Sequence, residues 1–186
     1  MPASSLSPWQ CFKTKWQNCS QCKLCEVRRN IVLAKGKIPC DVLFIGEAPG
    51  QSEDVCGIPF VGPAGHLLDQ QIAEALRNVG NPELRLAFTN LVCCIPKEGG
   101  TKTGEPDKEC IKACQPRLIE FVCLCNPRLI IKVGDLAVKW MEDLFEQIEQ
   151  ASITHPAAIL RAEIVRKPLM EQKVIVTLEC VFRELM

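Results

Sequence analysis

Net charge is the first property that this sequence lacks. Its 186 residues carry 22 basic and 22 acidic side chains, so the formal net charge is zero. This balance argues against a global positive field for nucleic acid, and any DNA contact must come from a local patch. No apolar run is long enough to span a membrane, and residues 1–16 lack the apolar centre of a signal peptide. We therefore expect a cytoplasmic protein without a membrane partner.

Histidine is also scarce, whereas cysteine is abundant: the chain has two histidines and 13 cysteines. An odd number of cysteines without a secretion signal disfavours a disulfide framework and favours metal ligation plus buried free thiols. Cys19, Cys22 and Cys25 form two overlapping Cys-x-x-Cys pairs. Four more cysteines flank a polar loop further along, namely Cys93, Cys94, Cys110 and Cys114. This spacing is typical of zinc or of a [4Fe–4S] cluster and does not distinguish between them.

Short apolar runs alternate with amphipathic stretches along the chain. We expect strands at 41–45, 86–92, 129–133 and 152–154, and helices at 64–79, 106–123 and 135–150. The segment from Lys173 fits either a helix or a strand. This alternation predicts an α/β fold, a three-layer α/β/α sandwich around a central four-stranded, mostly parallel sheet. Residues 1–18 are expected to be a loose N-terminal lead-in, and residues 19–186 a single domain.

The expected site lies beyond the carboxyl ends of the strands, where ligands bind in open α/β sheets. The glycine- and proline-rich stretch 46–63, the segment after Asn90 and the stretch 155–161 should meet there. A loop as long as 46–63 is usually functional, although a tight strand-to-helix turn is the simpler alternative. Residues 95–105 are expected to form a polar loop.

Three side chains in these segments are candidates for recognising a planar base. Phe60 could stack on the base, or it could anchor the loop in the core. Asn90 offers a donor and an acceptor to a pyrimidine edge, although an Asx-turn would use the same groups. His155 could donate to a developing oxyanion, or it could be a capping or satisfied core histidine.

Taken in order, the motifs resemble the fourth, iron–sulfur family of uracil-DNA glycosylases. The matching segments are Cys19-x-x-Cys22-x-Leu24, Arg28/Arg29-Asn30-x-Val32, Gly46 to Asp54, Gly57 to Gly65, Thr89-Asn90-x-Val92-x-Cys94-x-Pro96, Cys114 with Asn126-Pro127, Val133-Gly134-x-x-Ala137 and Thr154 to Arg161. The resemblance covers residues 19–161, and the ordered set is far more specific than any single motif.

The resemblance implies an enzyme that flips uracil out of DNA and hydrolyses its N-glycosidic bond, which begins base excision repair. The implied catalytic residues are Glu47, which would lie in a water-activating loop, and His155, which would hydrogen-bond uracil O2. The implied uracil-binding residues are Gly46, Ala48, Phe60 and Asn90. The implied DNA-binding residues, in a loop pressed into the minor groove, are Leu160 and Arg161.

The resemblance also implies a [4Fe–4S] cluster. Its implied ligands are Cys19, Cys22, Cys94 and Cys114, and Cys110 competes with Cys114 for the last position. The implied partner is uracil-containing single- or double-stranded DNA, with replication or repair proteins as further candidates, and we expect a monomer. The chain departs from the family in a short Gly134–His155 segment and in His-Pro-Ala where His-Pro-Ser is frequent.

Three other functions remain open. A member of the same superfamily could act on another deaminated base, and a non-catalytic member could bind DNA or a repair partner. A zinc-stabilised protein of unrelated function is the simplest alternative. The polar set of Glu47, Asn90 and His155 favours catalysis, because a purely structural module does not need it.

Overall fold

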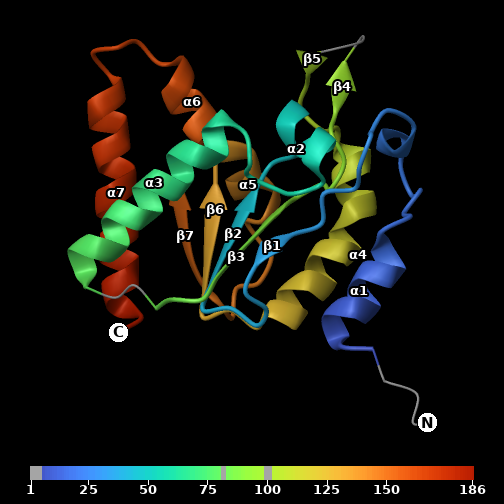
Figure 1. Cartoon of the computed structure of the whole chain (residues 1–186), viewed down its shortest axis with the longest axis horizontal. Coiled ribbons are helices and arrows are strands. Elements are labelled where there is room, and N and C mark those ends of the chain that lie inside the picture. The colour runs from blue at the N-terminus through green and yellow to red at the C-terminus, as the bar shows by residue number, and fades with distance from the viewer. Residues whose placement is uncertain (1–5, 81–82, 99–101) are drawn as a thin grey trace.

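The computed structural model describes residues 6–80, 83–98 and 102–186, and its centre is a five-stranded sheet (Figure 1). The sheet contains β1 (Lys35–Gly36), β2 (Val42–Gly46), β3 (Leu86–Asn90), β6 (Leu129–Val133) and β7 (Glu149–Ile153), in the order β1-β3-β2-β6-β7. The last four strands in this order are parallel, and β1 pairs antiparallel with β3.

Both faces of the sheet are covered, because the side chains of the buried strands alternate between two cores. Leu43 and Ile45 of β2 face one core, in which α4 (Lys108–Cys125) and α1 (Pro8–Trp16) pack. Val42 and Phe44 face the other, which is covered by α3 (Pro63–Val79), α6 (Pro156–Arg161) and α7 (Lys167–Glu184). Figure 1 shows these helix groups on opposite sides of the strands. The predicted α/β/α sandwich with a mostly parallel sheet is confirmed.

The sheet has one strand more than the four expected. β1 is only two residues long, so no periodic pattern marks it in the sequence. It lies so close to β3 that a Cβ on Gly36, whose φ is +109°, would stand 2.2 Å from the Leu86 carbonyl oxygen. Only glycine allows this contact. β1 thereby pairs with the strand at the edge of the parallel part of the sheet, β3.

The N-terminal segment is not a loose lead-in over its described part. Residues 8–16 form α1, which Ser7 caps by accepting a hydrogen bond from the Gln10 amide. Phe12 and Trp16 are buried, and the Phe12 ring lies 5.4 Å from that of Phe121 on α4. The expected loose lead-in was wrong, because a few apolar residues in a polar segment are enough to pack a short helix against the core. Residues 1–5 lie outside the described residues, and the single domain over 19–186 stays a prediction.

The helix expected over 135–150 ends early. α5 covers only Asp135–Trp140, and turns lead from it into β7. Phe145 adopts a left-handed backbone with φ of 63°, which a continuous helix does not allow. The Gln150 side chain donates to the carbonyl oxygens of Leu144 (2.8 Å) and Phe145 (2.9 Å). The side-chain amide thus satisfies carbonyls that a longer helix would have paired internally.

The predicted loops contain short elements of their own. The stretch 46–63 includes α2 (Gln51–Cys56), and 95–105 includes an antiparallel pair, β4 (Lys97–Glu98) with β5 (Lys102–Thr103). Residues 99–101 of that predicted loop lie outside the described residues. The ambiguous C-terminal segment is helical as α7, and η1 (Lys23–Glu26) is a 3₁₀ turn in the cysteine-rich segment. Among the described residues, no helix is long and apolar enough to cross a membrane.

Candidate active site

A cleft of about 860 Å³ opens beyond the carboxyl ends of the parallel strands. The segments after β2, β3, β6 and β7 all line it, and the loops predicted to converge do meet there. Figure 1 shows α6 and the β4–β5 hairpin at the same end of the sheet. Of the residues assigned by resemblance, the cleft brings together Glu47, Ala48, Phe60, Asn90, His155 and Arg161.

Phe60 and Asn90, which line the cleft, both lie against Gly46. Gly46 ends β2 directly opposite Asn90 at the end of β3. A Cβ on Gly46 would stand 2.6 Å from the Asn90 side-chain oxygen and 2.7 Å from Phe60 Cζ. Within the described residues, the Asn90 side-chain amide has no hydrogen-bond partner, so the Asx-turn alternative finds no support. The ring of Phe60 and the unpaired amide of Asn90 therefore both lie against Gly46, which has no side chain.

Phe60 is held in an unusual backbone conformation. Its φ is 54°, in the left-handed region that bulky residues rarely adopt. Lys35 Nζ donates to the Phe60 carbonyl oxygen at 3.0 Å, and Gly65 leaves the space that this carbonyl occupies. The side chain is 7% exposed and lies against Phe88, with 5.8 Å between ring centroids. Phe60 is thus both a loop anchor and part of the cleft wall.

His155 caps α6 and lines the cleft at the same time. Its Nδ1 accepts a hydrogen bond from the Ala157 amide at 3.1 Å, so the proton of the neutral ring resides on Nε2. Burial lowers the pKa of His155, nearby Arg161 lowers it further, and Glu53 partly offsets both. Gly134 permits the ring to approach, because a Cβ there would lie 2.9 Å from His155 Cβ. The site therefore presents a neutral N–H donor.

Glu47 follows Gly46 and is half-buried at the cleft. Burial raises the pKa of its carboxyl group, Glu105 raises it further, and Arg161 acts in the opposite direction. A carboxylate that is partly desolvated interacts more strongly with a positive charge or a polarised water than one in bulk solvent. Glu47 and His155 therefore give the cleft a potential anion and a neutral donor.

Two acidic residues that sequence reasoning assigned no role organise the loop. Glu53 accepts hydrogen bonds from the amides of Val61 (2.9 Å) and Gly62 (2.7 Å), which closes the loop around Phe60. Asp54 is buried and accepts from the Arg29 amide at 2.8 Å, and it pairs with Lys97 at 3.1 Å. Both residues lie in the Gly46 to Asp54 motif, and this motif is the sequence feature that could have identified them.

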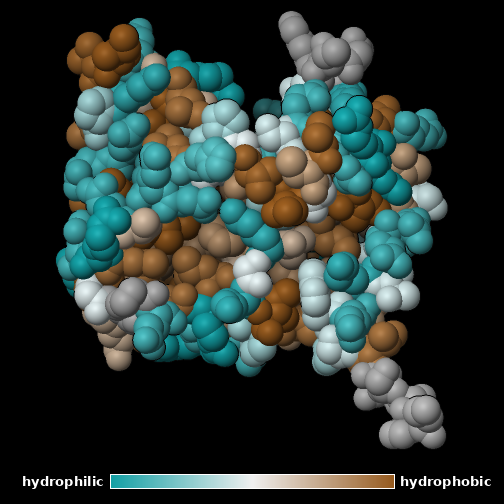
Figure 2. All heavy atoms as spheres, in the orientation of Figure 1, coloured by the Kyte–Doolittle hydropathy of each residue, from teal (hydrophilic) through white to brown (hydrophobic). Residues whose placement is uncertain are grey.

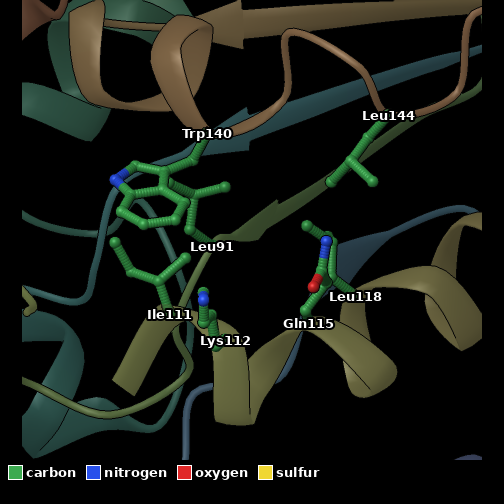
Figure 3. A pocket seen from close by; sticks show the side chains of 7 residues that line it. All are labelled: Leu91, Ile111, Lys112, Gln115, Leu118, Trp140 and Leu144. Atoms are coloured by element: carbon green, nitrogen blue, oxygen red, sulfur yellow. The ribbon is translucent and has the colours of Figure 1, made fainter. Parts of the chain in front are cut away.

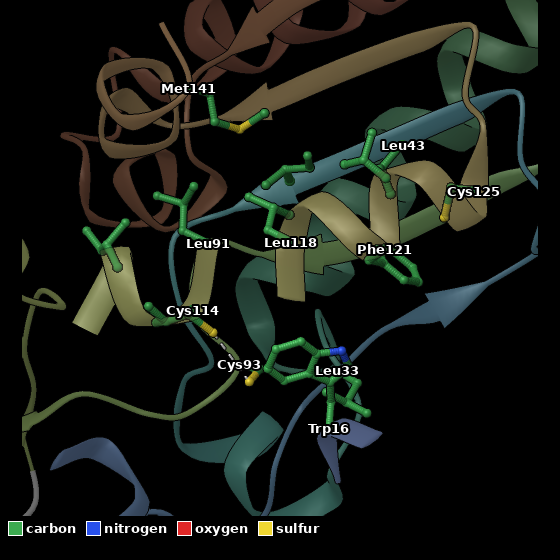
Figure 4. Packing of buried hydrophobic residues seen from close by; sticks show 14 of the residues in the cluster. Trp16, Leu33, Leu43, Leu91, Cys93, Cys114, Leu118, Phe121, Cys125 and Met141 are labelled. Atoms are coloured by element: carbon green, nitrogen blue, oxygen red, sulfur yellow. Dashed lines mark hydrogen bonds between the residues drawn. The ribbon is translucent and has the colours of Figure 1, made fainter. Parts of the chain in front are cut away.

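The cysteines expected to bind metal gather on one core cluster, beside α4. Cys94 and Cys114 are buried there, and Cys19 and Cys22 pack against the same cluster. Cys93 is an additional neighbour, since its Sγ lies 3.6 Å from Cys114 Sγ (Figure 4). Cys110, which competes with Cys114 for the last ligand position, is also near this site, because its thiol interacts with that of Cys22.

Two arginines direct their side chains at these thiols. Arg28 Nη1 lies 3.3 Å from Cys94 Sγ, and Arg117 Nη2 lies 3.5 Å from Cys114 Sγ. Within the described ranges, no three histidine, cysteine or acidic side chains converge closely enough to hold one metal ion. The pKa of Cys94 is lowered by its hydrogen bond with Cys93 and by Arg28, whereas the pKa of Cys114 is raised by its hydrogen bond with Cys93 and by burial. Cysteine thiols gathered beside one core cluster are the ligand type that iron–sulfur clusters use.

The expected DNA-facing residues lie at the rim of the cleft. Arg161 lines it, whereas Leu160 is 40% exposed and not part of the lining. The connection to α7 adds Ile164 and Val165, which are 84% and 89% exposed. Figure 2 shows apolar side chains gathered at this connection. Sequence reasoning missed both, because nothing in the sequence distinguishes them from core residues.

A second hollow lies between α4 and the segment after β6. It has a volume of about 140 Å³ and is lined by Leu91, Ile111, Lys112, Gln115, Leu118, Trp140 and Leu144 (Figure 3). None of the residues implied for uracil, DNA or metal lines it. The larger cleft is therefore the candidate active site.

A family profile described as the uracil DNA glycosylase superfamily matches residues 33–179. The chain belongs to this superfamily. A type-4 uracil-DNA glycosylase of Pyrobaculum aerophilum is 34% identical over 171 residues, which is 81% of this chain and 83% of the relative. One from Sulfurisphaera tokodaii is 36% identical over 124 residues, or 67% of this chain and 53% of the relative.

Solved structures show the same superfamily fold. SMUG2 of Pedobacter heparinus aligns with a TM-score of 0.58 at 14% identity, over 77% of this chain and 76% of that one. A putative uracil DNA glycosylase of Methanosarcina acetivorans aligns with a TM-score of 0.54 at 13% identity, over 83% of this chain and 98% of that one. At such low identity these structures show the fold alone.

Proposed function

We propose that this member of the superfamily is a monofunctional DNA glycosylase that flips uracil out of DNA and hydrolyses its N-glycosidic bond. The observation that carries the proposal is the convergence of Phe60 and Asn90, both against Gly46, in a cleft that also presents Glu47 and His155. Relatives named type-4 uracil-DNA glycosylases support the same activity.

Uracil would be recognised in the slot above Gly46. The Phe60 ring stacks on the extruded base, and the Asn90 amide reads its pyrimidine edge with one donor and one acceptor. Gly46 and Ala48 form the small-residue backbone next to the base. The amide of Asn90 supports this role, because it lines the cleft and is available to pair with a ligand there.

Bond cleavage would use His155 and Glu47. Breaking the glycosidic bond leaves negative charge on uracil and positive charge on the sugar. The Nε2–H of neutral His155 donates to uracil O2, and a preorganised donor of this kind contributes roughly 3–4 kcal/mol to the transition state. Glu47, in its ionised form, orients the attacking water and stabilises the sugar cation.

DNA would lie across the rim formed by α6 and the connection to α7. An enzyme that acts on a base must remove it from the stack, and apolar side chains can occupy the space that it leaves. We assign DNA contact to Leu160 and Arg161, and extend it to the exposed Ile164 and Val165. Their position beside the cleft supports this assignment.

A [4Fe–4S] cluster would be held by Cys19, Cys22, Cys94 and Cys114. When bound, it would supply structural ligation that ties the cysteine-rich segment, the end of β3 and α4 to one another. Asp54 supports the same arrangement, since it joins residues 29 and 30 to α2. The chain would act on single- or double-stranded DNA as a monomer in the cytoplasm, where replication or repair proteins could deliver it.

An excision assay tests the proposal. Iron-loaded protein, prepared anaerobically, is incubated with a uracil-containing oligonucleotide, heated in alkali and analysed for strand cleavage, with His155→Ala in parallel. Cleavage at uracil that the variant loses supports activity and site together. Cleavage only at another deaminated base, or DNA binding without cleavage, would replace the proposal with one of these alternatives.

Iron and acid-labile sulfide analysis tests the ligand set. We expect Cys114→Ala to lose iron and Cys110→Ala to retain it. The opposite pattern would exchange these two cysteines in the ligand set, and stoichiometric zinc in the wild-type protein would overturn the cluster.

A further inference from the structure

Arg117 of α4 is a fully buried side chain that contacts the end of β3. Its Nη1 donates to Thr89 Oγ1 at 2.8 Å, and its Nη2 donates to the carbonyl oxygens of Asn90 (2.7 Å) and Leu91 (2.9 Å). The side chain is 0% exposed. One planar guanidinium therefore binds three consecutive residues, and the middle one is the residue assigned to read uracil.

The positive charge of Arg117 is balanced in an unusual way. Among the described residues no carboxylate pairs with it, and its Nε has no hydrogen-bond partner. Besides the three oxygens at the end of β3, the guanidinium contacts the Cys114 thiol, whose Sγ lies 3.5 Å away, with Cys93 and Cys94 nearby. A buried charge is costly unless its hydrogen-bond donors are satisfied, so Arg117 depends on the end of β3 and on the cysteine site together.

We propose that Arg117 is a positioning residue that couples the cysteine site to the uracil-reading amide. On one side it contacts the thiol of Cys114, and on the other it fixes the backbone from which the Asn90 side chain projects. Loss of metal ligation at the cysteine site frees the Cys114 side chain and thereby loosens the contacts of Arg117 with β3. This inference rests on the proposed function for its catalytic consequence but not for its structural one.

Arg117→Met and Arg117→Lys test the coupling. Methionine keeps much of the volume without a buried charge, whereas lysine keeps the charge without the planar fork. Arg128→Met is the matched control, because Arg128 also donates to a backbone carbonyl, that of Leu185 at 2.8 Å, away from the cleft. For each protein we would measure iron content, iron loss to a chelator, kcat and KM for uracil excision, and hydrogen exchange of peptide 86–92.

We expect Arg117→Met to lower kcat at least tenfold with a smaller change in KM, to release iron several-fold faster, and to speed exchange in 86–92. Arg117→Lys should restore part of the iron retention. Arg128→Met should lower the melting temperature without these effects. If Arg117→Met resembles Arg128→Met in all four measurements, Arg117 is only structural and the proposal is wrong.

The wild-type protein gives an independent measurement if Arg117→Met does not fold. Removal of iron by a chelator should speed exchange in 86–92 more than in β6, and unchanged exchange in 86–92 would overturn the coupling. Absence of uracil excision by the iron-loaded wild type would refute the proposed function, whereas the exchange and iron-retention results would still decide the role of Arg117.

Discussion

Replacing Gly46 by alanine would place a methyl group against the two side chains that form the proposed uracil slot. The new Cβ would lie 2.6 Å from the Asn90 side-chain oxygen and 2.7 Å from Phe60 Cζ. Ordinary contact at this position needs at least 3.4 Å, so each neighbour must retreat by several tenths of an ångström or more. Both are the groups that we assign to hold the base.

The expected loss follows from this displacement. A misplacement of about 1 Å in a reacting geometry costs about 100-fold in rate. Such a loss corresponds to about 2.7 kcal/mol of transition-state stabilisation. Overpacking of the core would cost a further 1–3 kcal/mol of folding stability, roughly. We therefore expect Gly46→Ala to fold with a lowered melting temperature and to lose excision far beyond what that shift explains.

Gly80→Ala separates pocket effects from folding effects. Gly80 ends α3 with a φ of +69°, and a Cβ there would meet nothing within 4 Å. Alanine at this position should cost about 1–2 kcal/mol through the left-handed backbone alone. The assay compares kcat/KM on a uracil-containing oligonucleotide with thermal unfolding followed by circular dichroism. If Gly46→Ala retains excision within threefold of Gly80→Ala, the slot formed by Phe60 and Asn90 is not the base site.

Three further perturbations test other parts of the molecule. Excision should fall as the pH drops through the raised pKa of Glu47. Glu105→Gln should move this loss to lower pH, because the variant removes a negative charge that raises the pKa of Glu47. An unmoved pH profile would contradict the role of Glu47. Ile164→Ser should weaken DNA binding several-fold in a fluorescence anisotropy titration. Val176→Ser, which changes an exposed residue of α7 outside the cleft rim, should leave DNA binding unchanged. Phe12→Ala should lower the free energy of unfolding by about 3–5 kcal/mol in denaturant titration, and a negligible change would show that α1 is not part of the core.

Much of the fold could be predicted because local patterns and tertiary packing agree. The run ending at Ile45 and the run from Leu129 are largely apolar segments, and both are buried strands, except at the half-buried Lys132. The long α3 was predicted to within one residue, since its apolar stripe and Gly80 mark its face and its end. The convergence of the loops followed from parallel topology alone.

The remaining elements depend on contacts between distant residues. The apolar spacing of Trp140 and Leu144 is typical of a helix, yet α5 ends at Trp140. Beyond it, the Gln150 side chain donates to the carbonyl oxygens of Leu144 and Phe145. α1 forms because Phe12 finds Phe121, more than a hundred positions later. No local pattern in the sequence reveals that the guanidinium of Arg117 is fully buried. Such long-range polar contacts are invisible to periodicity.

The pairing of Gly46 with Asn90 places a restriction on how this chain can change in length. The two residues are opposite because β2 and β3 are aligned in register over five positions. Insertion of one residue in either strand would turn each following side chain to the other face and separate the glycine from the amide. Changes in chain length are therefore not tolerated within the two strands that carry this pair.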